Sequence, residues 1–308
     1  MATEPILATL DTALARRSDS GSGTFSDYWA LTKPEVNFLI LVTTFAGFYL
    51  ASDSGSGGLR ILSVVHTLLG TLLVASGTGV LNQYIEREFD AQMRRTARRP
   101  LASGRIKASY VLWFGISLSL AGTVYLALAV NFLASFLALV TLLSYLFVYT
   151  PLKRKSPLCT LVGAFPGAVP PLIGWAAAQG RLQPEAWALY TIVFLWQFPH
   201  FMAIAWMYRE DYARAGYLVL PLDHRRDRFV TWQSLAPSLA LIPASLLLAW
   251  NGGASFVYSA GALILGSIFF CYSERLAFRR SNTAARQLLA ASIVYLPAIF
   301  ILMMLNKK

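Results

Sequence analysis

Nine apolar stretches of about 20 residues each dominate this sequence and restrict the folds available to it. A helix rises about 1.5 Å per residue, so each stretch is long enough to cross the roughly 30 Å hydrocarbon core of a bilayer. Only 13% of the 308 residues are charged, compared with about 25% in soluble domains. We therefore predict an all-α integral membrane protein with nine transmembrane helices. The predicted spans are approximately 36–52, 60–82, 109–127, 131–149, 157–177, 187–207, 230–249, 254–273 and 286–305.

The basic residues fall almost entirely on one side of these spans. Of the 26 Lys and Arg residues, 22 lie before span 1 or in and at the edges of the loops that follow spans 2, 4, 6 and 8. The positive-inside rule places these segments, and with them the N-terminus, in the cytoplasm. Topology and phosphate binding thus account for the net charge of +11, and we predict no nucleic-acid partner.

The chain divides into a polar tail and one membrane domain. Residues 1–27 contain a Ser/Gly run and four acidic residues, which indicate a disordered tail and not a signal or transit peptide. Residues 28–308 form the membrane domain, with Pro34 suited to open its first helix. Span 5 contains the run F-P-G-A-V-P-P, whose prolines prevent a straight helix. We interpret that bend as one wall of a central chamber, with a packing kink as the alternative.

One stretch, residues 82–101, carries the strongest chemical signal. Asn82, Glu86 and Asp90 recur every four residues, so on a helix they lie on one face about 6 Å apart and direct their oxygen atoms into one space. Four arginines follow them, namely Arg94, Arg95, Arg98 and Arg99. Carboxylates and arginines at the mouth of a membrane helix suggest a site for a divalent metal and a polyphosphate. The alternative is a solvated loop whose charges only set the topology.

A second basic and aromatic group ends span 4, in the run Y-L-F-V-Y-T-P-L-K-R-K. Tyr145 and Tyr149 are four residues apart and share a helix face, and Lys153 and Arg154 follow. These residues form either an interfacial belt with topology-setting cations or an aromatic lining below anion-binding cations. Lys33, just before span 1, is in the same way either a phosphate contact or a snorkelling anchor.

Span 6 and its exit contain polar residues that are costly inside a membrane. Gln197 and His200 belong to the aromatic run W-Q-F-P-H-F. Intramembrane polar groups of this kind are functional candidates by default, with packing as the alternative. Glu210 and Asp211 follow on the same predicted membrane face as the acidic residues of span 2.

Taken together, these motifs resemble a known family. The run N-x3-E-x3-D-x2-M-x-R-T-x2-R-P-L, from Asn82 to Leu101, is similar to the first Asp-rich motif of the UbiA-type intramembrane prenyltransferases. Resemblance to their protohaem IX farnesyltransferase branch rests on L-T-K-P at 31–34, Y-T-P-L-K-R at 149–154, G-A-V-P-P-L-I-G-W at 167–175, W-Q-F-P-H-F at 196–201 and D-Y-A-R-A-G at 211–216. The second motif departs from the superfamily pattern D-x3-D, since the chain has Y-R-E-D-Y there. We therefore assign its acidic role to Asp211, and Glu210 is a weaker candidate.

The resemblance implies a reaction and a set of residues that carry it. The farnesyl group of farnesyl diphosphate would be transferred to a vinyl group of haem b, with addition of water, to give haem O and diphosphate. Mg²⁺ would be the cofactor, and haem b a substrate. The implied metal ligands are Asn82, Glu86, Asp90 and Asp211, which together with Arg95 and Tyr149 make up the catalytic set. The implied substrate contacts are Lys33, Arg99, Tyr145, Lys153, Arg154, Trp196, Gln197, His200 and Glu210.

Several expectations stay open at this point. His200 is the main predicted haem contact, as iron ligand, hydrogen-bond partner or packing residue, while His66 lies toward the opposite membrane face. The resemblance implies a multi-pass protein of the bacterial inner (plasma) membrane with its chamber open to the cytoplasm. A haem A synthase or oxidase assembly factors are the expected partners. The alternatives are a prenyltransferase for a quinone precursor or chlorophyllide, and a membrane transporter, in which kinked helices also occur.

Overall fold

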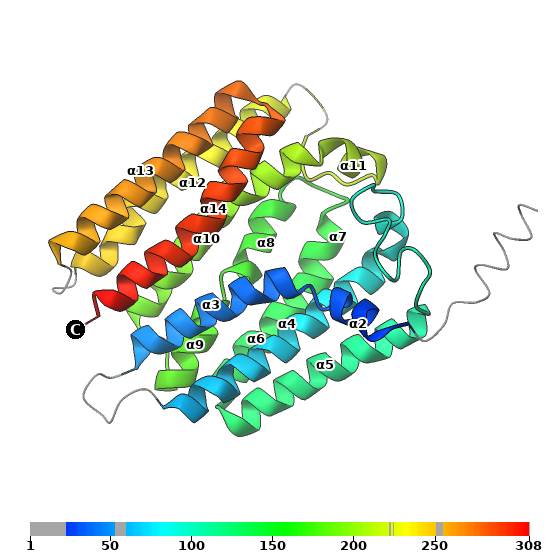
Figure 1. Cartoon of the computed structure of the whole chain (residues 1–308), viewed down its shortest axis with the longest axis horizontal. Helices are drawn as coiled ribbons and strands as arrows, with labels where there is room; N and C mark the ends of the chain where they lie inside the picture. Colours follow the sequence, from blue (N-terminus) through cyan, green and yellow to red (C-terminus); the bar gives the residue numbers. More distant parts are fainter. Residues whose placement is uncertain (1–22, 53–59, 222, 224, 251–254, 308) are drawn as a thin grey trace, which may run out of the picture.

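The chain folds as a bundle of membrane helices (Figure 1). The computed structural model describes residues 23–52, 60–221, 223, 225–250 and 255–307, and all regular secondary structure in these ranges is helical. Nine stretches within them are long and apolar enough to cross a membrane, which confirms the predicted fold class. They are α3 (Pro34–Ala51), α4 (Ile61–Asp90), α5 (Ala108–Ala129), α6 to α7 (Phe132–Leu152), α8 with α9 (Cys159–Gln179), α10 (Pro184–Met207), α12 (Arg225–Trp250), α13 (Phe256–Arg279) and α14 (Asn282–Leu305).

Short elements gather at one end of the bundle, which we call the basic end. It comprises α2 (Phe25–Leu31), the loop 91–107, residues 153–158 and α11 (Arg209–Arg214) (Figure 1). A capping box in which Thr24 and Asp27 bond to each other's backbone nitrogens starts α2. This helix begins within the stretch 1–27 that we expected to be disordered. Residues 1–22 lie outside the described part of the chain.

Helix α4 continues well beyond the apolar run that predicts it. It has 30 residues and ends at Asp90, whereas the predicted span ended near residue 82. The added turns contain no Gly or Pro, so nothing in them interrupts the helix, and Arg87 in the last turn suits the negative end of the helix dipole. Asn82, Glu86 and Asp90 therefore lie on one continuous helix at four-residue spacing.

Two of the spans are interrupted. The fourth consists of α6 (Phe132–Ser144), a π-helical segment η1 (Tyr145–Tyr149) and α7 (Thr150–Leu152). The fifth breaks between α8 (Cys159–Gly167) and α9 (Pro170–Gln179), because the proline that begins α9 has no N–H to continue the hydrogen-bond ladder. The predicted bend in span 5 is thus a complete break between two helices.

Helix α3 lies in backbone contact with α9. A Cβ atom added at Gly174 would lie 1.9 Å from the Thr44 carbonyl oxygen, and one added at Gly47 would lie 2.1 Å from the Pro171 carbonyl oxygen. Small residues permit such close approach in membrane bundles, where van der Waals packing holds helices together. The contact fixes the position of α3 and of Lys33, which directly precedes it.

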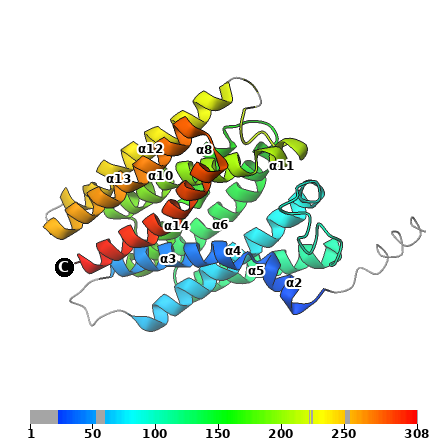
Figure 2. The same cartoon turned by 45° about the horizontal axis from the view of Figure 1, so that its top comes forward.

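Helices α10, α12, α13 and α14 pack side by side, and both Figure 1 and Figure 2 show this arrangement. A large apolar core joins these four helices, and a second one joins α4, α6 and α9. Apolar side chains also remain exposed on the periphery, such as Leu128 at 83% and Phe256 at 87%. In a bundle that spans a bilayer these side chains face lipid.

The contact between α3 and α9 yields a first prediction. Gly174→Ala should destabilise the protein by about 1–3 kcal/mol, because the added methyl group overlaps a carbonyl oxygen that cannot move without shifting α3. Thermal unfolding in detergent measures this effect. Gly79→Ala is the matched control, since its Cβ would meet its nearest neighbours at ordinary contact distances of 3.6 to 3.7 Å. Equal melting temperatures for the two variants would contradict the prediction.

Candidate active site

The four residues predicted to bind a metal are all buried at the basic end. Asn82, Glu86 and Asp90 are 1%, 6% and 2% exposed, and Asp211 is 7% exposed. Buried charges are tolerated only where they are paired and hydrogen-bonded. The partners of these four side chains therefore describe the site.

The ladder of polar residues on α4 is paired with cations from three other segments. The Lys33 Nζ donates to the Asn82 Oδ1 at 2.9 Å, and the Lys153 Nζ donates to the Glu86 Oε1 at 2.8 Å. The third pair joins the Arg99 guanidinium to the Asp90 carboxylate at 2.6 Å. Each potential metal ligand on α4 thus has one predicted phosphate-binding residue beside it.

The ladder is also bonded along its length. The Asn82 Nδ2 donates to the Glu86 Oε2 at 3.0 Å and to the Thr150 Oγ1 at 3.2 Å. Thr150 in turn donates its hydroxyl proton to the Tyr145 carbonyl at 2.8 Å. These bonds connect the final turns of α4 to the π-helical segment, a type of irregularity found frequently at functional sites.

The two lysines differ in their electrostatic surroundings. Burial, with Arg99 and Lys153 nearby, lowers the pKa of Lys33 to about 7. Burial also opposes the charge of Lys153, but Glu86 and the two tyrosines of η1 outweigh it and hold the pKa of Lys153 well above its usual value. The surroundings of Lys153 thus favour its charged form, whereas the cations Arg99 and Lys153 lie near Lys33 and disfavour its charge. The backbone φ of Lys33 is 55°. Such a backbone conformation is strained for a residue other than Gly and occurs often at functional sites.

Aromatic rings adjoin the cations. The rings of Tyr145 and Tyr149 lie 4.9 Å apart, and the Lys153 Nζ lies 4.7 Å from the centre of the Tyr149 ring. The Arg154 guanidinium lies 4.2 Å from the centre of the Phe89 ring. The sequence prediction that the end of span 4 combines an aromatic lining with anion-binding groups is compatible with this arrangement.

Asp211 has a different set of contacts. Its two carboxylate oxygens accept from the Arg95 backbone N–H and from the Arg214 guanidinium, each at 3.1 Å. The Arg95 guanidinium lies over Tyr208 and Tyr212, at 5.0 and 6.0 Å from the ring centres. Asp211 thus holds the loop 91–107 against α11, and the Arg95 side chain extends toward α11, while it is Arg99 that pairs with Asp90.

Other predicted contacts lie apart from this cluster. The Glu210 side chain is 78% exposed and lies 3.8 Å from Arg209. Gln197 is buried, and its amide donates to the carbonyls of Ala164 and Val193 at 3.2 and 3.1 Å, so it supports the region where span 5 breaks. Trp196 and His200 form a separate group with α14. His66 bonds to Tyr125 at 2.6 Å near the start of α4, far along the helix from the ladder.

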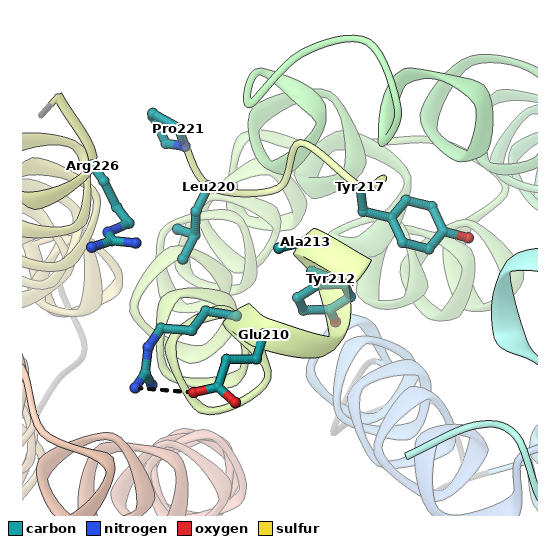
Figure 3. A pocket seen from close by; sticks show the side chains of 8 residues that line it. Glu210, Tyr212, Ala213, Tyr217, Leu220, Pro221 and Arg226 are labelled. Carbon is teal, nitrogen blue, oxygen red and sulfur yellow. Dashed lines mark ion pairs between the residues drawn. The ribbon is translucent and has the colours of Figure 1, made fainter. Parts of the chain in front are cut away.

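Sequence reasoning missed two residues of the site, Thr150 and Tyr217. Tyr217 is 3% exposed, its side chain interacts with that of Glu86, and its ring centre lies 6.0 Å from the Lys153 Nζ. Burial and then the charge of Glu86 raise the pKa of Tyr217 above its ordinary range. On its other side Tyr217 lines a cavity of about 160 Å³ with Arg226, while its ring is directed away from that arginine (Figure 3). The motif Y-T-P-L-K contains Thr150, but its partner Asn82 is 68 residues away.

The metal-binding prediction can be compared with this geometry. In the described ranges, no three His, Cys, Asp or Glu side chains converge closely enough to hold a metal ion. The donor set itself consists of carboxylate and amide oxygens, which are the ligands that Mg²⁺ prefers. The ladder therefore fits Mg²⁺ in chemistry, and binding would require its oxygens to be shared between the metal and the basic partners.

The fold and this site describe a polytopic membrane protein with a buried set of oxygen ligands and phosphate-binding cations. Residues 40–301 match the model of the UbiA prenyltransferase family, and the chain belongs to this family. Membership excludes the transporter alternative.

Individual relatives within the family are named for a particular reaction. The chain is 48% identical to the protoheme IX farnesyltransferase of Solibacter usitatus, and the match covers 91% of this chain and 98% of the relative. It is 42% identical to the protoheme IX farnesyltransferase of Koribacter versatilis, with 91% of this chain and 93% of the relative covered. Among solved structures, a digeranylgeranylglyceryl phosphate synthase superposes with a TM-score of 0.74 at 16% identity, over 92% of this chain and 98% of that one. A UbiA homologue from Archaeoglobus fulgidus bound to GPP and Mg²⁺ superposes with a TM-score of 0.62 at 17% identity, over 90% of this chain and 99% of that one. These structures share the fold of the chain.

The contacts of Asp211 yield a second prediction. Asp211→Ala should release the loop 91–107 from α11, because it removes charge-assisted hydrogen bonds worth about 1.5–3 kcal/mol. The arginines of that loop make it a trypsin substrate, so limited proteolysis of the purified protein should cut it roughly tenfold faster or more. Glu210→Ala, the exposed neighbour on the same helix, should leave the rate unchanged. A loop equally resistant in both variants would show that Asp211 does not hold it.

Proposed function

We propose that the protein transfers the farnesyl group of farnesyl diphosphate to a vinyl group of haem b, with addition of water, to give haem O and diphosphate for haem-copper oxidases. The observation that carries this proposal is the pairing of buried oxygen ligands on α4 with Lys33, Lys153 and Arg99. Relatives that share 36–48% of its residues over most of the chain bear the name protoheme IX farnesyltransferase, which supports haem b as the acceptor.

The chemical step needs a place for the charge of the leaving group. The bond between the farnesyl C1 and the diphosphate oxygen breaks, and its electron pair leaves with the diphosphate. Arg99 and Lys153 would neutralise that developing charge, assisted by Lys33, because fixed cations in a buried site stabilise charge more than water does. Arg95 and Arg154, which lie over the rings of Tyr208 and Phe89, would be further contacts for the diphosphate.

Mg²⁺ is expected as the cofactor, and Asn82, Glu86, Asp90 and Asp211 would hold it. When bound, the metal supplies positive charge to the diphosphate oxygens. A structural neighbour binds GPP together with Mg²⁺, which supports this expectation. Asp211 is connected to the ladder through the loop 91–107, so its contribution as a ligand would depend on how that loop is docked.

The farnesyl cation and the acceptor require an apolar, water-poor space. The faces of Tyr145 and Tyr149 would stabilise the cation through their π-systems. An alkene carbon of the haem vinyl group then bonds to the farnesyl C1, and the resulting cation beside the porphyrin ring takes up a water oxygen and releases a proton. Trp196 and His200 would contact the haem, whereas the buried hydrogen bonds of Gln197 favour a supporting role for that residue.

The orientation of the protein follows from its charges. Of the 26 Lys and Arg residues, 11 belong to the basic end, and 22 fall on the side of the membrane that includes it. We therefore place the basic end, the N-terminus and the mouth of the site in the cytoplasm of a bacterial inner membrane. A haem A synthase or oxidase assembly factors remain the predicted partners.

The direct test uses purified protein in nanodiscs with labelled farnesyl diphosphate and haem b. We expect a haem product with the mass of added farnesyl and water, together with one diphosphate released for each product. An aromatic quinone precursor and chlorophyllide serve as competing acceptors. Transfer to either of these, with haem b left unmodified, would overturn the assignment of the acceptor.

The pairing of Arg99 with Asp90 yields a third prediction. Arg99→Gln should lower kcat by about 10²–10³, because it removes a cation that stabilises the leaving group. Arg99→Lys should retain part of the activity, since it keeps the charge but loses the planar fork. Arg105→Gln is the control, because that arginine lies in the same loop, is half exposed and pairs with Asp27. Comparable rates for Arg99→Gln and Arg105→Gln would remove Arg99 from the chemistry.

Metal removal is the fourth prediction. Treatment with EDTA should abolish both farnesyl transfer and tight binding of farnesyl diphosphate, because the carboxylates of the ladder would then repel the phosphate oxygens. Added Mg²⁺ should restore both. Turnover that persists at full rate in a metal-free buffer would argue against a Mg²⁺ requirement.

A further inference from the structure

A second polar contact lies within the bundle, away from the charged ladder. The Nδ1 atom of His200 on α10 lies 2.8 Å from the Ser292 Oγ on α14. The Trp196 Nε1 donates to the Ser292 carbonyl at 2.8 Å, and the ring of Trp196 stacks on that of His200 at 4.7 Å. Two hydrogen bonds to one serine thus fix the imidazole and the indole against α14.

The direction of the His200 hydrogen bond follows from counting protons. A serine hydroxyl carries one proton, and the Ser292 Oγ lies 2.6 Å from the Leu289 carbonyl oxygen. Two oxygen atoms approach this closely when a proton lies between them, so the Ser292 hydroxyl donates to Leu289. Ser292 must then accept from His200, which places the imidazole proton on Nδ1. The Nε2 atom keeps its lone pair and has no hydrogen-bond partner in the described ranges.

The position of His200 around α10 directs it into the bundle. Successive helical residues are about 100° apart, so His200 lies about 40° from Trp196 and about 60° from Gln197. Trp196 contacts α14 and Gln197 contacts α8, so His200 lies between the two helices. The exposed Trp187 marks the outer face of α10, about 140° away by the same count. Helix α3 contacts both α10 and α14. His200 is partly accessible, so its ring keeps an edge that the described residues do not cover.

We propose that Ser292 is a positioning residue: it fixes the His200 tautomer whose Nε2 ligates the iron of the haem acceptor. The inference rests on the proposed function, which supplies the haem. A metal-ligating histidine usually donates its other N–H to an oxygen acceptor, which orients the ring and raises its basicity. Ser292 provides that acceptor from a different helix, and the stacked Trp196 holds the plane of the imidazole.

Ligation would place the iron at a fixed distance from α10. A porphyrin anchored in this way keeps its iron at one place while the farnesyl group arrives from the basic end. His200 is thus a substrate ligand, and Ser292 acts on the acceptor only through it. No atom of Ser292 needs to touch the haem.

The test measures haem binding in the full-length protein without farnesyl diphosphate, so no turnover is involved. Ferrous haem b bound to the unaltered protein should show an iron–histidine stretch in its resonance Raman spectrum. His200→Gly should lose that band and regain it with added imidazole. Ser292→Ala should shift the band to lower frequency and weaken haem binding by about 10- to 100-fold, because the ligand loses its hydrogen-bond acceptor. Ser273→Ala is the control, since that buried serine donates to the Phe269 carbonyl of its own helix and has no partner on another helix among the described residues.

The possible outcomes separate the two proposals. Circular dichroism and gel filtration first establish that each variant is folded. A band unchanged in His200→Gly would overturn ligation by His200, and a band and affinity unchanged in Ser292→Ala would overturn the role of Ser292. In both cases the farnesyl transfer assay can still succeed, which leaves the proposed function intact. Failure of the unaltered protein to bind haem b would overturn both.

Discussion

The structure depends most on the need to neutralise buried charge at the end of α4. Glu86 and Asp90 are nearly inaccessible, and an unpaired carboxylate in that position would cost several kcal/mol. Their partners come from segments far apart in the sequence, Lys153 after span 4 and Arg99 in the loop that follows α4. Asn82 brings in Lys33 from the entrance of α3. One helix face therefore determines where three connecting segments must lie, and the basic end is assembled around it.

The same pairing bears on how a substrate can be accepted. A metal ion alone would compete with Lys153 and Arg99 for the carboxylates and leave those cations without partners. A diphosphate alone would attract the cations and leave the carboxylates exposed to each other. The metal and the diphosphate together offer a partner to every charged group, so the balance of charge favours their joint binding. Tyr145 and Tyr149 adjoin this balanced set, where a carbocation would form.

Much of this arrangement was predictable because it depends on short-range patterns. The nine spans follow from apolar length, and the α4 ladder follows from four-residue spacing on a helix. The pairing of Lys33 with Asn82 could not be predicted, because it depends on a left-handed backbone at Lys33 and on the close contact of α3 with α9. Nor does sequence spacing reveal that Arg95 extends toward the tyrosines of α11, or that Gln197 supports a neighbouring helix. These side-chain contacts depend on residues that are distant in the sequence, so a local sequence motif does not predict them.

The π-helical turn at Tyr145–Tyr149 has a further consequence. Such a turn accommodates one residue more than an α-helical turn, and every residue after it is rotated relative to a regular helix, by about 100° for one residue. Thr150 and Lys153, which bond to Asn82 and Glu86 on α4, follow directly after this turn. Loss of a single residue from the turn would restore an ideal helix while directing Lys153 away from Glu86. Alignments of this segment should therefore tolerate exchanges of residue type far better than changes in length.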